Sequence, residues 1–164
     1  MHTTASLRDQ ITAGVVAGLA AGLVMELFLF ATFVPSGDPV RALSASFVFI
    51  SAVLLGPGAQ ANPAAVPLGI LLHFCVAVGW ALGYVYLVRS QPQLVRRPWI
   101  SGACYGIVVY VFMQIVLLTA GQYHRPSSAV QLEIALAAHI LFYGIPVALI
   151  VSRMLRAAAR PATV

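Results

Sequence analysis

The chain has 164 residues, of which 61% are hydrophobic and only 8% are charged, and its mean hydropathy is +0.95. Soluble globular domains carry about 25% charged residues, so this composition excludes an ordinary soluble domain and indicates a membrane protein. The net charge of +5 rests on arginine, because the chain has no lysine. No basic stretch interleaved with aromatic residues lies outside the membrane flanks, which excludes a nucleic-acid-binding surface.

Four segments are each long enough to cross a hydrocarbon core, which takes about 20 apolar residues. They are residues 11–33, 64–88, 99–120 and 129–151. Because they use most of the chain, we predict a single all-α integral membrane domain over residues 1–164. Its architecture is a bundle of four transmembrane helices with no separate soluble domain.

A further apolar stretch, residues 40–56, follows the first predicted span and is bracketed by Pro35, Pro39 and Pro57. If this stretch crossed the membrane, Arg8 would lie on the opposite side from the arginine-rich loop at 89–98 and the C-terminal arginines. We therefore predict that it forms a short interfacial or re-entrant helix on the outer face.

The arginines are distributed unequally between the two sides of a four-span bundle. Only Arg41 and Arg125 fall on one side, and the loop at 89–98 and both termini carry all the others. Since cytoplasmic loops carry an excess of Arg and Lys, both termini are predicted to be cytoplasmic. This basic rim would attract the anionic headgroups of the lipid bilayer.

An internal duplication is the strongest pattern in the chain. We divide it into a first repeat, residues 8–89, which includes an extra outer segment at 40–62, and a second repeat, residues 96–156. The aligned residues are Arg8 with Arg96, Gly14 with Gly102, Gly18 with Gly106, Met25 with Met113, Glu26 with Gln114, and His73 with His139. Because each repeat crosses twice, the two copies would point the same way and be related by an axis along the membrane normal.

Four polar side chains lie at similar depths in the predicted spans. With a rise of about 1.5 Å per residue, Glu26, His73, Gln114 and His139 fall within about one helical turn of a common plane. Ionisable residues in transmembrane helices face the bundle interior, because lipid offers them no partner. We therefore predict that these four side chains converge in a polar layer.

The sequence leaves several roles open for this layer. It could simply provide hydrogen bonds that fix which helices are neighbours. Alternatively, His73 and His139 could ligate haem b from facing helices of the bundle. In that case Gly69 and Gly144 would leave room for the porphyrin. The cationic side chains of Arg41 and Arg125 would then lie on the outer side of the bundle, which is nearer to the two histidines, where they could bind the haem propionates.

Two other roles use the same histidines or their neighbours. A metal ion could be held by His73 and His139 together with Met25, Met113 or Glu26, since thioether and imidazole suit copper, whereas imidazole and carboxylate suit zinc or iron. Glu26 could instead be the titrating group of a small proton- or cation-coupled transporter that acts as an oligomer.

Four short motifs, one in each predicted span, resemble those of uncharacterised bacterial inner-membrane proteins with a YagU-like layout. They are "GVVAGLAAGLVME", "HFCVAVGWALGY", "GACYG" and "HILFYG". The resemblance implies a four-pass protein of the bacterial inner membrane and carries no established activity.

No catalytic constellation is recognisable in the sequence. Together with the near absence of soluble mass, this predicts a small accessory subunit of a larger respiratory or other electron-transfer complex, holding haem or a metal between His73 and His139. Its expected partners are other membrane subunits or further copies of the chain. The transporter that works through Glu26 is the alternative.

Overall fold

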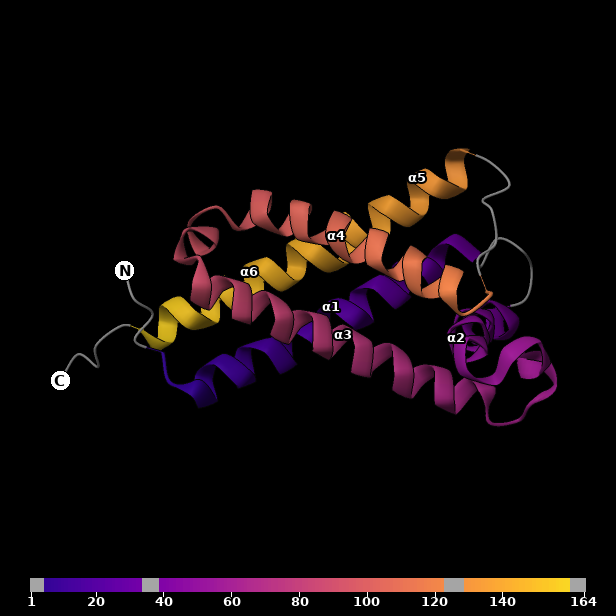
Figure 1. Ribbon diagram of the computed structural model, residues 1–164. Helices are drawn as coiled ribbons and strands as arrows, with labels where there is room; N and C mark the ends of the chain where they lie inside the picture. The colour runs from indigo at the N-terminus through magenta and orange to yellow at the C-terminus, as the bar shows by residue number, and fades with distance from the viewer. Residues whose placement is uncertain (1–4, 34–38, 123–128, 160–164) are drawn as a thin grey trace.

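The computed structural model describes residues 5–33, 39–122 and 129–159, and in these ranges the chain is helical with no strand. Figure 1 shows long helices running lengthwise beside one another, with the start of α1 and the end of α6 at the same end of the molecule. The elements are α1 (Leu7–Phe33), α2 (Pro39–Leu55), η2 (Gly56–Ala61), α3 (Ala65–Ser90), η3 (Pro92–Arg96), α4 (Pro98–Thr119), α5 (Ala129–Ala137), η4 (Ala138–Gly144) and α6 (Ile145–Ala158).

The predicted spans coincide with these helices to within a few residues, apart from the start of the first and the end of the last. Helix α1 begins at Leu7 because Ser6 and Asp9 form a capping box. In it, the Ser6 N–H donates to Asp9 Oδ2 (3.1 Å) and the Asp9 N–H donates to Ser6 Oγ (3.2 Å). The final helix continues to Ala158, well beyond the predicted end at residue 151.

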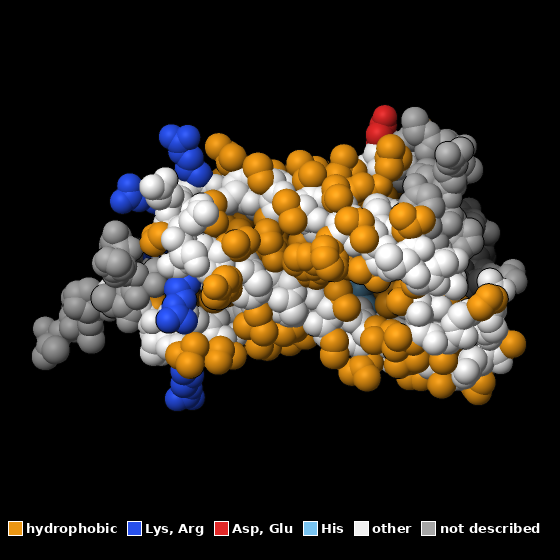
Figure 2. Space-filling view, in the orientation of Figure 1, with side chains coloured by type: hydrophobic (Ala, Val, Ile, Leu, Met, Phe, Trp, Pro, Cys, Tyr) orange, Lys and Arg blue, Asp and Glu red, His pale blue; other side chains and the backbone are white. Residues whose placement is uncertain are grey.

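Within the described residues, five helical stretches are long and apolar enough to cross a membrane. Large apolar side chains are exposed along them, among them Leu23, Leu71, Val108 and Leu141. Hydrophobic side chains also cover much of the face seen in Figure 2, and arginines gather at one end. An apolar exterior of this extent is compatible with a protein that lies in lipid.

The stretch Ser44–Ala61, which was not predicted to be a span, contains most of the segment predicted to be interfacial. Figure 1 shows α2 nearly end-on, at the end of the bundle opposite to the start of α1, whereas the other long helices run lengthwise. The helix packs closely on α3: a Cβ atom at Gly69 would overlap the backbone carbonyl of Phe47.

Glycines let the helix backbones approach one another in both halves of the chain. A Cβ atom on Gly18 of α1 would overlap the backbone of α3 at Val78, and one on Gly106 of α4 would overlap the backbone of η4 at His139. Small residues at helix interfaces permit this close packing in membranes. The central helices are α1 and α6, since α1 packs against α3 and α6, and α4 packs against η4 and α6.

The last membrane-length helix contains a π-helical segment, η4, between α5 and α6. Pro146 follows directly in the first turn of α6, and proline removes a backbone donor and crowds the carbonyl four residues before it. A π-bulge accommodates such a disruption and is frequent at functional sites. His139 lies inside this segment.

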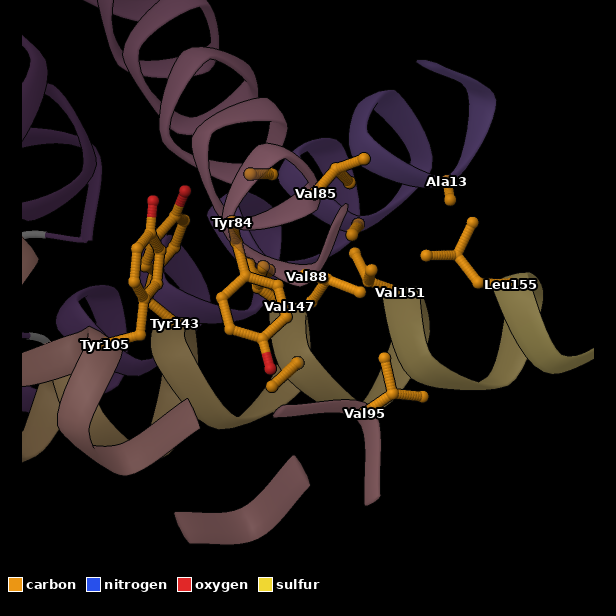
Figure 3. Packing of buried hydrophobic residues seen from close by; sticks show 14 of the residues in the cluster. Ala13, Tyr84, Val85, Val88, Val95, Tyr105, Tyr143, Val147, Val151 and Leu155 are labelled. Carbon is orange, nitrogen blue, oxygen red and sulfur yellow. The ribbon is translucent and has the colours of Figure 1, made fainter. Parts of the chain in front are cut away.

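Between α3 and α4, side chains rather than close backbone contacts form the interface. Tyr105 of α4 donates to the carbonyl of Trp80, and the rings of Trp80 and Phe112 meet edge to face at 4.9 Å. Tyr143 of η4 also reaches α3, where its hydroxyl donates to the Ala77 carbonyl (2.6 Å). Figure 3 shows Tyr84, Tyr105 and Tyr143 grouped beside the buried valines of α3 and α6.

Candidate functional site

Glu26 is the only carboxylate buried among the described residues, with a relative exposure of 5%. Glu26 lies in the C-terminal part of α1, where it contacts both α2 and α3. The hydroxyl of Ser46 on α2 donates to Glu26 Oε2 (3.0 Å), and His73 Nδ1 on α3 lies 3.3 Å from Glu26 Oε1. Three helices therefore meet at one carboxyl group.

The surroundings of the His73 ring determine where its protons are. Nε2 lies 3.1 Å from the Gly22 carbonyl oxygen, which can only accept, so Nε2 carries a hydrogen. Nδ1 then faces Glu26 Oε1. The two atoms lie at ion-pair distance but do not form a hydrogen bond, and Glu26 Oε1 is a buried oxygen without a hydrogen-bond partner among the described residues. We call Glu26 and His73 the acid–imidazole pair.

Apolar groups surround the pair. The ring of Phe47 meets the His73 ring edge to face at 6.2 Å, and the ring of Phe74 does so at 5.1 Å. A Cβ atom at Gly22 would lie 3.3 Å from His73 Nε2, so glycine is what leaves this face of α1 open to the ring. In such low-dielectric surroundings, an unpaired charge is costly.

The equivalent residues of the second half have different contacts. His139 Nδ1 donates to the Ala135 carbonyl one turn earlier (2.8 Å). Its ring meets the Tyr110 ring edge to face at 5.3 Å. Gln114 is half-buried, and no hydrogen bond joins it to His139 in the part of the chain that the structure describes. Of the four residues predicted to converge, Glu26 and His73 lie at ion-pair distance, and His139 is near enough to His73 for an electrostatic interaction between them.

The residues proposed as metal ligands do not form one cluster. Within residues 5–33, 39–122 and 129–159, no group of three His, Cys, Asp or Glu side chains is placed to hold a metal ion, although Glu26, His73 and His139 are all described. Met25 and Met113 pack against the apolar core. Two arginines were predicted to bind the propionates of a haem. Arg41 lies in α2, but its side chain is not among those that the structure describes, and Arg125 lies outside the described residues.

Haem b does not fit this arrangement. Both ring nitrogens of His73 are engaged, Nε2 with Gly22 and Nδ1 with Glu26. The room that Gly69 was expected to leave is filled by the backbone of α2 at Phe47, and Gly144 lies directly against Gly106 of α4. Axial ligation by His73 would require breaking the acid–imidazole pair and separating these helices.

Sequence reasoning missed Ser46 as a member of the site. The polar hydroxyl in the apolar stretch 40–56 was a usable signal, because a hydroxyl in such a helix needs an acceptor. Its acceptor could not be identified from sequence, since it depends on how α2 packs against α1.

A family model described as a family of unknown function, DUF6789, matches residues 8–162. The match covers both predicted repeats and includes Glu26, Ser46 and His73. No curated protein and no solved structure matches the chain.

Proposed function

The chain belongs to the DUF6789 family, and we propose that it is a small proton-coupled membrane transporter whose proton site is the pair Glu26 and His73. The observation that carries this proposal is the 3.3 Å approach of His73 Nδ1 to a buried Glu26 oxygen, with the second ring nitrogen already committed to a carbonyl. An intramembrane carboxyl group paired with histidine is typical of a proton relay.

In this proposal, the pair binds one proton between Glu26 Oε1 and His73 Nδ1. Loss of this shared proton would change the contact between the two helices. With the proton in place, Glu26 Oε1 and His73 Nδ1 attract each other and hold α1 against α3. When the proton leaves, a carboxylate faces the lone pair of a neutral imidazole and the two repel each other. Proton binding and release therefore change the free energy of the α1–α3 contact, which is the coupling that a transporter needs.

The proposed topology has four crossings with α2 at the outer face. Support comes from the arginines, since Arg8, Arg89, Arg96 and Arg153 all lie at the ends of α1, α3, α4 and α6 that share one side of the bundle (Figures 1 and 2). By the positive-inside rule, this side would face the cytoplasm, and the proposed location is a bacterial inner membrane.

The proposal includes the tandem two-helix duplication. Three aligned pairs of residues make equivalent contacts. A Cβ atom at Gly14 would meet Leu82, and one at Gly102 would meet Ala148; likewise, Gly18 packs on Val78, and Gly106 packs on Gly144. Finally, Gly22 lies against the His73 ring, and Tyr110 lies against the His139 ring. This correspondence supports a duplication, because a chance similarity between glycine-rich helices would not produce equivalent contacts.

The test is a pH step applied to the protein in liposomes adsorbed on a solid-supported membrane. The wild-type protein should give a transient charge displacement as the pair takes up protons. Glu26→Gln should abolish it, because an amide cannot take up a proton there.

Glu133→Gln is the matched control, since Glu133 is exposed on α5 and should leave the displacement unchanged. Both variants should elute as single species and unfold at the wild-type temperature to within a few degrees. A full displacement in Glu26→Gln, or its loss in Glu133→Gln, would contradict the proposal.

A further inference from the structure

A cavity of about 650 Å³ lies between α3 and α4 at the arginine-rich end of the bundle. It exists because the backbones of α3 and α4 stay apart while α1 and α6 pack closely. Figure 2 views this side, with arginines at the end and hydrophobic side chains along the bundle. The volume is in the range of small-molecule binding pockets, about 300–1,000 Å³.

The lining of the cavity changes character along the bundle axis. Near the helix ends it is polar and basic, with Gln91, Gln93, Arg96 and Arg97. Further into the bundle it is formed by apolar and hydroxyl-bearing side chains: Leu87, Ile100, Cys104, Val108, Tyr84, Ser101 and Tyr105. The Tyr84 and Ser101 hydroxyls are hydrogen-bonded to each other (2.8 Å). A basic mouth with an apolar interior suits an anionic amphiphile.

The two arginines at the mouth have no acidic partner in the part of the chain that the structure describes: no carboxylate there lies at ion-pair distance from Arg96 or Arg97. The first turn of α4, which begins at Pro98, adds the positive end of a helix dipole beside the same two arginines.

We propose that this cavity binds one anionic phospholipid of the surrounding leaflet. The phosphate would lie at Arg96 and Arg97, since a guanidinium binds phosphate bidentately. The upper part of the acyl chains would lie along Ile100, Cys104 and Val108. Charge complementarity favours an anionic over a zwitterionic lipid, and the apolar lining favours a lipid over a free phosphate ion.

The two cysteines allow the occupant to be detected. Both cysteines are exposed; Cys104 lines the cavity, whereas Cys75 on α3 does not and is an internal reference. In vesicles of phosphatidylcholine with a minor share of phosphatidylglycerol, N-ethylmaleimide should alkylate Cys104 more slowly relative to Cys75 than in phosphatidylcholine alone. We expect a slowing of roughly fivefold, the factor one arginine contributes near an anionic surface, read from peptide masses.

A charge-matched pair of double variants distinguishes the cavity from the basic rim. Arg96→Gln with Arg97→Gln should remove the protection of Cys104. Arg89→Gln with Arg153→Gln should retain it, because both of these arginines are exposed and neither lines the cavity. Equal protection by phosphatidylcholine alone, protection by inorganic phosphate, or loss of protection in both double variants would overturn the proposal.

Discussion

The two halves of the bundle place histidine at equivalent positions but give it different partners. His73 lies 3.3 Å from the Glu26 carboxyl group, whereas His139 donates to a carbonyl of its own helix and packs against the Tyr110 ring. At the position aligned with Glu26, the second half has Gln114. One half therefore has a carboxyl group beside its histidine, and the other has an amide at the aligned position.

The backbone packing of the two halves, by contrast, is similar. Gly18 of α1 is pressed against the backbone of α3, and Gly106 of α4 against the backbone of η4. Close backbone contact is a property of glycine and tolerates little change, whereas a side chain that lines a polar layer can be exchanged without moving a helix. The comparison teaches that the helix arrangement and the proton chemistry rest on different residues.

The aligned residues Ala77 and Tyr143 touch each other, because the Tyr143 hydroxyl donates to the Ala77 carbonyl. In a two-fold arrangement, equivalent residues meet only near the axis. If the halves are duplicates, their pseudo-symmetry axis passes close to this hydrogen bond, within the core of the bundle.

The largest effect is expected when the carboxyl group is moved from one half to the other. The double variant Glu26→Gln with Gln114→Glu keeps the net charge but should show no charge displacement after a pH step. His139 Nδ1 is committed to Ala135, so its ring does not offer the new carboxyl group the geometry of His73. A displacement equal to that of the wild type would instead show that the halves are interchangeable.

The next effect concerns the shared packing. Gly18→Val and Gly106→Val should each lower the free energy of unfolding by about 1–3 kcal/mol, the usual cost of overpacking, because each Cβ atom would enter a neighbouring backbone. Gly79→Val is the control, since nothing lies within 4 Å of a Cβ atom there. Steric-trap unfolding in detergent measures all three. Unequal losses at Gly18 and Gly106 would break the structural equivalence of the halves.

The sequence predicted the helices better than it predicted the site. Apolar segments of membrane length locate helices directly, so the four main helices coincide with the prediction except at the N-terminal cap of α1 and the end of α6. The aligned glycines of α1 and α4 lie on faces that pack closely against neighbouring helices.

Side-chain orientation limited the prediction of the polar layer. Depth along a helix can be counted from sequence, and it placed Glu26 and His73 at one level. The π-helical segment around His139 changes the register of the helix, and Ser46 reaches Glu26 only because α2 packs beside α1 and α3. Both depend on tertiary packing, which residue spacing does not contain.

A smaller effect is expected at the contact between the halves. Tyr143→Phe should lower the free energy of unfolding by about 1 kcal/mol, because it removes one buried hydrogen bond to Ala77 without opening a cavity. Tyr86→Phe is the control, since Tyr86 is 69% exposed. Thermal unfolding in one detergent compares the two. Equal stability of both variants would mean that this hydrogen bond does not hold the halves together.

The smallest effect is the coupling energy between each histidine and its aligned partner. In double-mutant cycles with alanine, Glu26 and His73 should couple by about 0.6 kcal/mol and at most about 1.7, the range of interhelical polar contacts in membranes. Gln114 and His139 should couple by less than about 0.3 kcal/mol, because non-contacting sites are additive to about that precision. Raising the pH should weaken only the first coupling, since loss of the shared proton turns the attraction between Glu26 and His73 into repulsion. Equal coupling in both halves, or a coupling between Glu26 and His73 that does not depend on pH, would mean that ordinary packing joins these two residues. The difference between the halves would then have no consequence for proton binding.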